Sequence, residues 1–387
     1  MNKLVLLAMI LVLGACGTNS DSSVVEESGA SEPNDNAVKL PGKPPFNAVA
    51  VTTFDEPWAM TFLPDGRLLV TEKPGSLYWV TQDGQKSAPI TGAPDVDYGN
   101  QGGLGDIVLH PDFANNNIVY LSFAEAGDNN TRGAAVMRAT LNVTAAGGSL
   151  TDSSIIWRQV PKVTGRGHFG HRIAFADDGM MYISSGERQK FDPSQDMQSN
   201  MGKVVRLFDD GRVPEDNPFS DQGGVTAQIW SLGHRNPLGL AFDSEGRLWN
   251  TEMGPRHGDE LNLVKPGANY GYPLVSNGDH YNGNQIPDHE TRPDLDAPAA
   301  YWVPAISPAG LMFYSGDLFE DWQGDAFIGG LSSQALVRVE FEGDSAKEAE
   351  RYPMGTRVRE IEQGPNGAIW ILEDGDGGRL MKLTPAS

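Results

Sequence analysis

Short runs of alternating apolar and polar residues recur along the chain from about residue 43 to its end. Each run is followed by a turn containing Gly, Asp or Asn and then by a second short apolar stretch. The pattern occurs six times, at 59–72, 107–123, 172–187, 239–252, 311–330 and 359–374. Alternation with period 2 between turn residues predicts β-hairpins. No stretch keeps an amphipathic helical period for more than two turns.

Six copies of one hairpin, spaced by about 50 to 70 residues, favour a closed repeat architecture of six four-stranded blades around a central channel. A two-sheet sandwich is the alternative, but it would not repeat a single hairpin six times. We therefore predict an all-β fold, a six-bladed β-propeller with four-stranded antiparallel blades.

The N-terminal segment has a different pattern. Lys3 precedes an unbroken apolar run from Leu4 to Leu13, and Gly14, Ala15 and Cys16 follow. The run is shorter than the roughly 20 residues of a membrane-spanning helix and has the proportions of a secretory signal. Its end resembles the bacterial lipobox, in which the cysteine becomes a lipidated N-terminus; the alternative is an ordinary cleaved signal peptide.

Residues 17–42 are rich in Ser, Asn, Asp, Glu, Gly and Pro and contain no aromatic residue, which is typical of a flexible segment. We expect a signal peptide at 1–15, a lipidated flexible tether at 16–42 and the propeller domain at 43–387. Gly17, not Asp, follows the cysteine. This predicts a protein anchored by lipid to the periplasmic side of the outer membrane of a Gram-negative bacterium.

Charge and cysteine content exclude two classes of protein. With 29 basic and 51 acidic residues, the net charge is −22, which disfavours nucleic acid as a partner. Cys16 is the only cysteine, so a disulfide framework is excluded. In so acidic a chain, any concentration of arginines becomes informative.

Unusual polar residues lie between the predicted strands, where propellers carry their sites. Arg357 and Arg359 are two apart in a strand-like segment, so they share one face and repel unless an anion or carboxylate lies between them. With Arg235 they suit a ligand bearing several carboxylates or phosphates. Asp259 and Glu260 are candidate oxygen ligands for calcium, or simply part of a solvated acidic loop.

Histidines allow a second kind of metal site. A zinc site would use His168, His171, His234 and His257, but no His-Glu-x-x-His motif or cysteine pair supports it. For each of these histidines, the alternative is a hydrogen-bonded structural residue.

Several motifs occur together in one order: GNQGGLG with HPDF, HxxxR, SGE, GKVVRL with DGRVPEDNP, GHRNPLGLAF, GPRHGDELNL, NYGYP and RxR. From about residue 46 onward, this set resembles the soluble PQQ-dependent glucose/sorbosone dehydrogenases, in particular the bacterial aldose sugar dehydrogenases. The resemblance implies a six-bladed propeller that binds pyrroloquinoline quinone (PQQ) and calcium (Ca2+). It also implies oxidation of an aldose to a lactone at the anomeric carbon, with electrons passing to an external acceptor.

The resemblance also assigns catalytic roles. His168 matches the base that removes the proton of the anomeric hydroxyl, and Glu187 matches the carboxylate that orients it. A carboxylate partner is expected to raise the pKa of His168 and to fix its tautomer. Arg235 and Asn236 match residues beside the quinone oxygens, where Arg235 would stabilise developing negative charge. Gln101 matches a residue beside the quinone and the sugar.

Cofactor and metal contacts follow in the same way. The resemblance implies that Arg357 and Arg359 hold PQQ carboxylates and flank the sugar. Further matches concern calcium: the carbonyls of Gly254 and Pro255 correspond to ligands of the cofactor-bound ion, and Glu260 and Tyr270 to ligands of a separate structural ion.

Two positions depart from the family pattern. His171 stands where the family has glycine, and Ser332 stands where the family has a lysine that pairs with a PQQ carboxylate. The missing charge-assisted contact is typically worth ~1.5–3 kcal/mol. Two alternatives to a dehydrogenase are a calcium-dependent propeller hydrolase of the lactonase type, in which His168 and Glu187 activate water, and a sugar-binding lipoprotein without redox activity.

Overall fold

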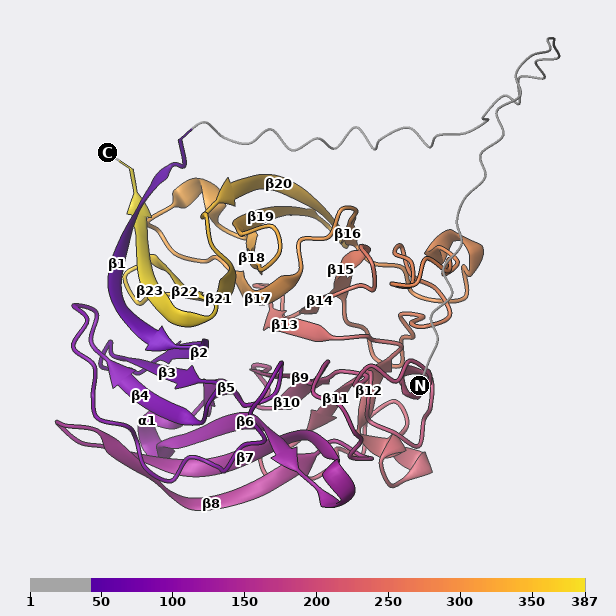
Figure 1. The fold of residues 1–387 in the computed structure, drawn as a ribbon, viewed down its shortest axis with the longest axis horizontal. Coiled ribbons are helices and arrows are strands. Elements are labelled where there is room, and N and C mark those ends of the chain that lie inside the picture. Colours follow the sequence, from indigo (N-terminus) through magenta and orange to yellow (C-terminus); the bar gives the residue numbers. More distant parts are fainter. Residues whose placement is uncertain (1–42, 387) are drawn as a thin grey trace, which may run out of the picture. The chain divides into compact units, whose positions relative to one another are not determined.

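Six antiparallel sheets form a ring in residues 43–386, the part of the chain that the computed structural model describes (Figure 1). The innermost strands are β2 (Pro57–Phe62), β5 (Leu104–Leu109), β9 (Gly170–Phe175), β13 (Pro237–Phe242), β17 (Pro308–Phe313) and β21 (Val358–Gln363). Consecutive inner strands are neighbours, and β21 also contacts β2, which closes the ring. The predicted β-propeller is confirmed.

Each blade continues outward from its inner strand. The second strands are β3 (Leu68–Glu72), β6 (Ile118–Ala126), β10 (Met181–Ser185), β14 (Leu248–Glu252), β18 (Ala326–Gly330) and β22 (Ile369–Glu373). The third strands are β4 (Ser76–Val80), β7 (Arg132–Val143), β11 (Lys203–Leu207), β15 (Asp259–Leu263), β19 (Ala335–Glu342) and β23 (Asp376–Pro385). The outer strands are β8 (Gly148–Arg158), β12 (Ile229–Leu232), β16 (Ala300–Trp302), β20 (Ser345–Pro353) and β1 (Phe46–Asp55). The six repeats seen in the sequence correspond to the inner and second strands.

Helical structure within residues 43–386 is confined to short segments. One α-helix, α1 (Phe113–Asn116), is a single turn. The 3-10 turns are Asp128–Asn130, Asp192–Ser194, Ser220–Gln222, Thr226–Gln228, His289–Thr291 and Glu320–Trp322. No helix in this range is long and apolar enough to cross a membrane. The predicted signal peptide, Cys16 and the tether lie outside the described residues.

The core is distributed between the blades. Six apolar clusters fill the interfaces between neighbouring sheets. Because β3, β10, β14, β18 and β22 lie inside these interfaces, all their residues are buried. Trp249 on β14 and Trp370 on β22 are completely buried. Burial on both faces lets apolar residues follow one another, as in Ile369–Leu372 of β22, whereas the long outer strands β1, β8 and β20 are mostly exposed or partly exposed.

The two ends of the described chain close the ring. Strand β1 pairs antiparallel with β23, from Phe46 opposite Pro385 to Asp55 opposite Asp376. Figure 1 shows β1 lying alongside β23 at the edge of the last blade. The last blade is therefore built from both ends of the described chain. This arrangement holds the ring closed, and a closed ring protects its strand edges.

One blade differs from the prediction. The sheet β2–β3–β4 has three strands, not four. The segment after β4 contains Pro89, Pro94 and several glycines, and proline cannot donate to a strand ladder. Instead it crosses to the neighbouring blade, where Thr91 forms a bridge with Ser149 of β8 and Ile90 enters the apolar interface.

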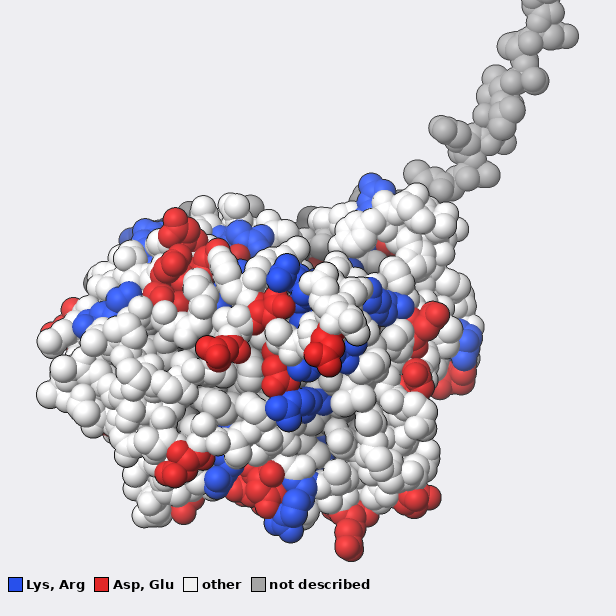
Figure 2. Space-filling view, turned by 60° about the horizontal axis from the view of Figure 1, so that its bottom comes forward, with Lys and Arg blue, Asp and Glu red and all other residues white. Residues whose placement is uncertain are grey.

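On the face drawn in Figure 2, basic and acidic side chains are interspersed. That face therefore carries no broad region of positive charge of the kind a polyanion would need.

Candidate functional site

A cavity of about 350 Å³ lies at one end of the ring, and it is lined by residues of five blades and of the β4–β5 connection. Its lining residues are Glu56, Trp58, Lys73, Asn100, Gln101, Phe169, Gly170, His171, Leu238, Met253, Leu331, Arg357, Arg359, Asp374 and Gly375. In every blade, the pairing of inner and second strand shifts register at this same end. Such bulges redirect side chains. The repeated irregularity therefore shapes the wall of the cavity.

The predicted catalytic pair is assembled beside this cavity. Nδ1 of His168 donates a hydrogen bond to Oε1 of Glu187. The other oxygen of Glu187 accepts the backbone N–H of Lys190 and that of Phe191, the latter at 2.8 Å. Gln101 holds the histidine from the other side, since its Oε1 accepts the backbone N–H of His168 at 2.6 Å. The carboxylate thus fixes the tautomer and leaves Nε2 unprotonated.

The protonation of this pair differs from the expectation. Burial lowers the pKa of His168 below its ordinary value, and the charge of Arg235 lowers it further, outweighing the opposite effect of Glu187. The prediction that Glu187 would give a net rise in the pKa of His168 is therefore wrong, because His168 is only 6% exposed and burial disfavours its charged form. Burial alone would raise the pKa of Glu187, but the His168 hydrogen bond and charge help to bring it below its ordinary value. A neutral imidazole and an ionised carboxylate result.

His171 occupies the family's glycine position as part of the cavity wall. Its ring stacks on Trp58, with centroids 4.9 Å apart. Room for the ring comes from Gly105, where a Cβ would lie 1.9 Å from Cε1 of His171. The Ser122 hydroxyl lies 2.7 Å from Nδ1 and accepts the backbone N–H of Asp106. Burial holds the pKa of His171 at about 3, so this imidazole is neutral.

Among the described residues, the four histidines of the alternative zinc site have separate partners. His234 lies between Ser231 and Glu252, with its Nε2 2.8 Å from Ser231 Oγ and its Nδ1 2.8 Å from Glu252 Oε1. His257 accepts the backbone N–H of Ala305 through Nδ1 at 3.2 Å. No three His, Cys, Asp or Glu residues in this range are grouped so as to hold a metal.

Arg235 and Asn236 lie at the start of β13, next to the cavity. The guanidinium of Arg235 donates from Nη1 to the carbonyl of Met253 at 2.8 Å. Its Nε is buried with no hydrogen-bond partner in residues 43–386, and so is the hydroxyl of the nearby Tyr272. Asn236 is completely buried and accepts the backbone N–H of Gly170 at 3.2 Å. Asn236 thus supports the loop of His168, and two polar atoms near Arg235 remain available to a ligand.

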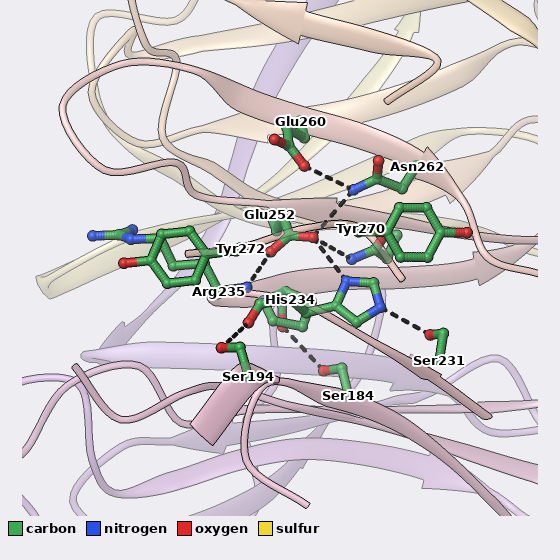
Figure 3. A network of polar contacts seen from close by, with 12 residues as sticks. Ser184, Ser194, Ser231, His234, Arg235, Glu252, Glu260, Asn262, Tyr270 and Tyr272 are labelled. Carbon is green, nitrogen blue, oxygen red and sulfur yellow. Dashed lines mark hydrogen bonds and ion pairs between the residues drawn. The ribbon is translucent and has the colours of Figure 1, made fainter. Parts of the chain in front are cut away.

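A buried network holds Arg235 from behind (Figure 3). Oε2 of Glu252 accepts the backbone N–H of Arg235 at 2.6 Å, and Oε1 accepts Nδ2 of Asn262 at 3.1 Å as well as the bond from His234. Ser194 donates to the carbonyl of His234 at 2.7 Å. Burial would raise the pKa of Glu252, but the charge and hydrogen bond of His234 contribute to lowering it. Glu252 is therefore an ionised anchor for the segment that carries Arg235.

Arg357 and Arg359 meet at one carboxylate. Nε of Arg357 donates to Asp374 Oδ2 at 2.6 Å, and Nε of Arg359 donates to Oδ1 at 2.8 Å. This satisfies the expectation that an anion or carboxylate lies between them. At the same cavity, Lys73 Nζ lies 2.6 Å from Glu56 Oε2. Three cations against two carboxylates make the lining net positive, although the chain as a whole carries −22.

The predicted calcium segment is a loop before β15 in which Gly254, Pro255 and Gly258 are buried, whereas Arg256 and His257 are exposed. Gly254 donates its N–H to Oδ1 of Asp259 at 2.9 Å, while Oδ2 accepts the N–H groups of Ile306 and Ser307 at 2.7 and 2.6 Å. Burial raises the pKa of Asp259 to about 6 despite these donors. Within the described residues, the carbonyl oxygens of Gly254 and Pro255 accept no hydrogen bond. Both are therefore free to act as metal ligands.

Glu260 and Tyr270 lie behind the Glu252 network. Burial raises the pKa of Glu260, and nearby Glu252 raises it further. In the described part of the chain, Oδ1 of Asn262 and Oδ1 of Asn250 are buried with no partner. Tyr270 stacks on His234 at 4.7 Å, and its hydroxyl bonds the carbonyl of Leu263 and the N–H of Lys265. Only the main-chain oxygen of Tyr270 is therefore available to an ion.

Ser332 provides no substitute for the family lysine. Ser332 is exposed, and its backbone N–H donates to the carbonyl of Ile306 at 3.1 Å. It does not line the cavity, although its neighbour Leu331 does.

Acidic residues recur at or just after the end of four second strands, and the sequence analysis did not use this signal. Second strands β3 and β14 end in Glu72 and Glu252, while Glu187 and Asp374 follow shortly after β10 and β22. The aligned repeats contain this signal, because four of them end in an acidic residue. Glu56, Lys73 and Trp58 were also missed, since residues around a first repeat carry no distinguishing motif.

Comparison with known proteins identifies the family of the chain. The family model described as Glucose / Sorbosone dehydrogenase matches residues 54–382. Aldose sugar dehydrogenase YliI of Escherichia coli strain K12 is 39% identical over 338 residues, covering 86% of this chain and 90% of the relative.

Two solved structures share the fold over nearly their whole length. The apo-form of the soluble aldose sugar dehydrogenase from Escherichia coli has a TM-score of 0.84 at 38% identity, covering 88% of this chain and 100% of that one. The PQQ-bound aldose sugar dehydrogenase from Streptomyces coelicolor has a TM-score of 0.73 at 29% identity, covering 89% and 99%. The chain is therefore a member of the glucose/sorbosone dehydrogenase family and a homologue of the aldose sugar dehydrogenases.

Proposed function

We propose that this protein oxidises aldose sugars to lactones at the anomeric carbon, with PQQ as cofactor and an external electron acceptor. The observation that carries the proposal is the His168–Glu187 pair, held beside a cavity that concentrates arginines in an acidic chain. Support comes from relatives: the Escherichia coli protein is named an aldose sugar dehydrogenase, and the Streptomyces coelicolor structure is a PQQ-bound form.

The residues present fit an anionic, oxygen-rich cofactor. The Nε of Arg235 and the hydroxyl of Tyr272 are buried without partners in the described range, which is costly unless a ligand completes them. Arg357 and Arg359 would hold carboxylates of PQQ, and Gln101 and Asn236 would border it. Replacing Ser332 by Lys should tighten PQQ binding by supplying the missing cation; unchanged or weaker affinity would contradict that assignment.

The chain's own chemistry centres on His168. Its neutral ring has a proton on Nδ1, held by Glu187, so Nε2 is the atom that accepts the proton of the sugar's anomeric hydroxyl. The ionised Glu187 then stabilises the imidazolium that forms. Arg235, which is buried and lies close enough to lower the pKa of His168, would stabilise negative charge developing on oxygen. When bound, PQQ supplies a hydride acceptor.

Calcium is the metal that suits the oxygen donors. The free carbonyls of Gly254 and Pro255 would bind the ion beside the cofactor. A second ion would be held by Glu260 and the main-chain oxygen of Tyr270, near the buried carboxylate of Glu252 and two buried amide oxygens that have no hydrogen-bond partner in the described residues. Chelation should lower the melting temperature of the protein and calcium should restore it. Glu260→Gln should reduce this difference if the second site is real.

Reconstitution tests the function. The purified protein is mixed with PQQ and calcium, and the absorbance of the cofactor is followed after addition of a panel of aldoses. Bleaching of oxidised PQQ by an aldose is the expected result. Lactone hydrolysis without any bleaching would favour the hydrolase, and sugar binding without either reaction would favour a binding lipoprotein.

We also propose that the enzyme is a lipoprotein attached through Cys16 to the periplasmic side of the outer membrane. The lipobox-like sequence supports this. A single acyl chain binds a membrane only reversibly, whereas the several chains carried by a lipoprotein cysteine give a stable anchor. Cys16→Ser should release the protein or leave it unprocessed in fractionated cells, whereas a correctly cleaved variant that still needs detergent for release would contradict the anchor.

A further inference from the structure

A strained loop follows Glu187 directly and reaches the protein surface at Phe191. Arg188, Gln189 and Phe191 have φ values of 62°, 59° and 64°, in the left-handed region that bulky residues rarely adopt. Phe191 is also 44% exposed, unlike most large apolar residues of this protein. Strain of this kind persists only where the surroundings hold it, and it is concentrated at ligand sites.

The surroundings hold this loop firmly. Arg188 is completely buried, and its guanidinium donates to the carbonyls of Gly167 and Arg132 at 2.9 and 2.8 Å. The backbone N–H of Phe191 donates to Glu187, whose other oxygen bonds His168. The backbone that carries the exposed ring of Phe191 is therefore tied directly to the His168–Glu187 pair.

A second aromatic group faces the same region from the segment after β15. The ring of Phe191 lies 5.7 Å from that of His280 and 6.3 Å from that of Tyr272. Tyr281, which is 74% exposed, follows directly, and the guanidinium carbon of Arg235 lies 6.0 Å from its ring and 5.9 Å from that of Tyr272. These contacts connect both exposed rings to the residues around His168.

The turn carrying Tyr281 is held in place by its backbone. His280 N–H donates to the carbonyl of Asn284 at 3.0 Å. The preceding residue, Asp279, exchanges two backbone hydrogen bonds with Arg256 at 2.7 and 3.2 Å. Exposed aromatic rings on two anchored loops leave apolar area in water without any gain to the fold.

We propose that Phe191 and Tyr281 form a stacking platform for the six-membered ring of the aldose substrate. The C–H face of a pyranose is apolar while its edge carries hydroxyls, so an aromatic face can bury the former. Tyr272 and Arg235 connect the two rings to the residues beside His168. The platform rests on the proposed function, because it places the anomeric hydroxyl near His168.

Sugar kinetics in the PQQ- and calcium-loaded protein test the platform. Phe191→Ala and Tyr281→Ala should each raise the KM for D-glucose or D-xylose about tenfold, equivalent to ~1.4 kcal/mol, with kcat, PQQ affinity and the pH profile changed little. Phe191→Tyr should restore most of the loss, since the ring is retained. Leu318→Ala is the matched control: Leu318 is 38% exposed in the β17–β18 connection, at the end of the strands away from the cavity. It should leave KM unchanged.

A binding measurement on the cofactor-free protein separates this inference from the proposed function. Saturation-transfer NMR should show contact between the aldose ring protons and the wild-type protein, and Phe191→Ala should reduce the signal. If the NMR signal shows aldose binding to the cofactor-free wild type but the reconstituted wild type does not bleach PQQ, the platform stands and the proposed dehydrogenase activity is refuted. Bleaching in the wild type with unchanged KM in both alanine variants would refute the platform alone. Absence of any transfer to the wild type would also overturn the platform.

Discussion

The contact between His171 and Gly105 makes a quantitative prediction about the cavity wall. A methyl group added at position 105 would lie 1.9 Å from Cε1 and 2.3 Å from Nδ1 of His171, and 2.9 Å from Oγ of Ser122. Backbone strain does not contribute, since Gly105 is not in the left-handed region. Gly105→Ala therefore tests packing, chiefly against the imidazole and to a smaller extent against the Ser122 hydroxyl.

The expected loss of stability follows from the steric overlap in Gly105→Ala and from the contacts that His171→Gly removes. Overpacking a filled interior costs typically 1–3 kcal/mol, and overlap this close predicts a cost of about 3 kcal/mol for Gly105→Ala. His171→Gly loses the stacking on Trp58, worth roughly 0.5–1.5 kcal/mol, and other buried contacts. It also relieves about 1 kcal/mol of strain, because His171 has a φ of 62°. In the double variant the methyl group occupies vacated space, so we expect a coupling free energy of ~2–3 kcal/mol.

Urea unfolding of the wild type, both single variants and the double variant measures this coupling. The slopes with denaturant should agree among the four proteins, so that midpoints report stability. Gly105→Ala should be strongly destabilising in the wild type and nearly neutral in His171→Gly. Equal destabilisation in both backgrounds would refute the contact and the reasoning built on it.

Three further predictions concern protons and charge. Because the pKa of His171 is about 3 in the folded protein against an ordinary 6.5, only the unfolded chain gains this proton below pH 6.5. Stability should fall by roughly 2.5 kcal/mol between pH 7 and 4.5 from this residue, and a His171→Gly variant that shows an undiminished slope in pH-dependent unfolding would contradict it. His168→Ala should slow reduction of bound PQQ by sugar roughly 10²–10⁴-fold in stopped-flow absorbance while PQQ binding persists; Glu187→Gln should cost less and move the acidic limb of the rate profile to lower pH, and full activity of His168→Ala would reject this base. Replacing Arg357 and Arg359 together by Ala should weaken PQQ binding sharply in fluorescence titrations, with Lys only a partial rescue because it lacks the bidentate fork; unaltered affinity would show that the cofactor lies elsewhere.

The sequence by itself determined the number of blades and the order of the site segments. A strand alternates with period 2 whatever surrounds it, so six hairpins were visible without any knowledge of their neighbours. The same regularity places Arg357 and Arg359, two residues apart, on one face, from which an anion or carboxylate between them was expected. Family motifs added the candidate base His168 and its partner Glu187, which the structure brings into contact.

Contacts between blades decided the rest. Which residue lies between the arginines, Asp374, depends on a second strand ending at the cavity. His171 is held by Trp58 from another blade, and the last blade is completed by β1, which pairs with β23. The sign of the pKa change at His168 had the same origin: the hydrogen bond to Glu187 was foreseeable, but the larger effect is desolvation. Desolvation sums over all blades packed around a group, and no local pattern in the chain records that sum.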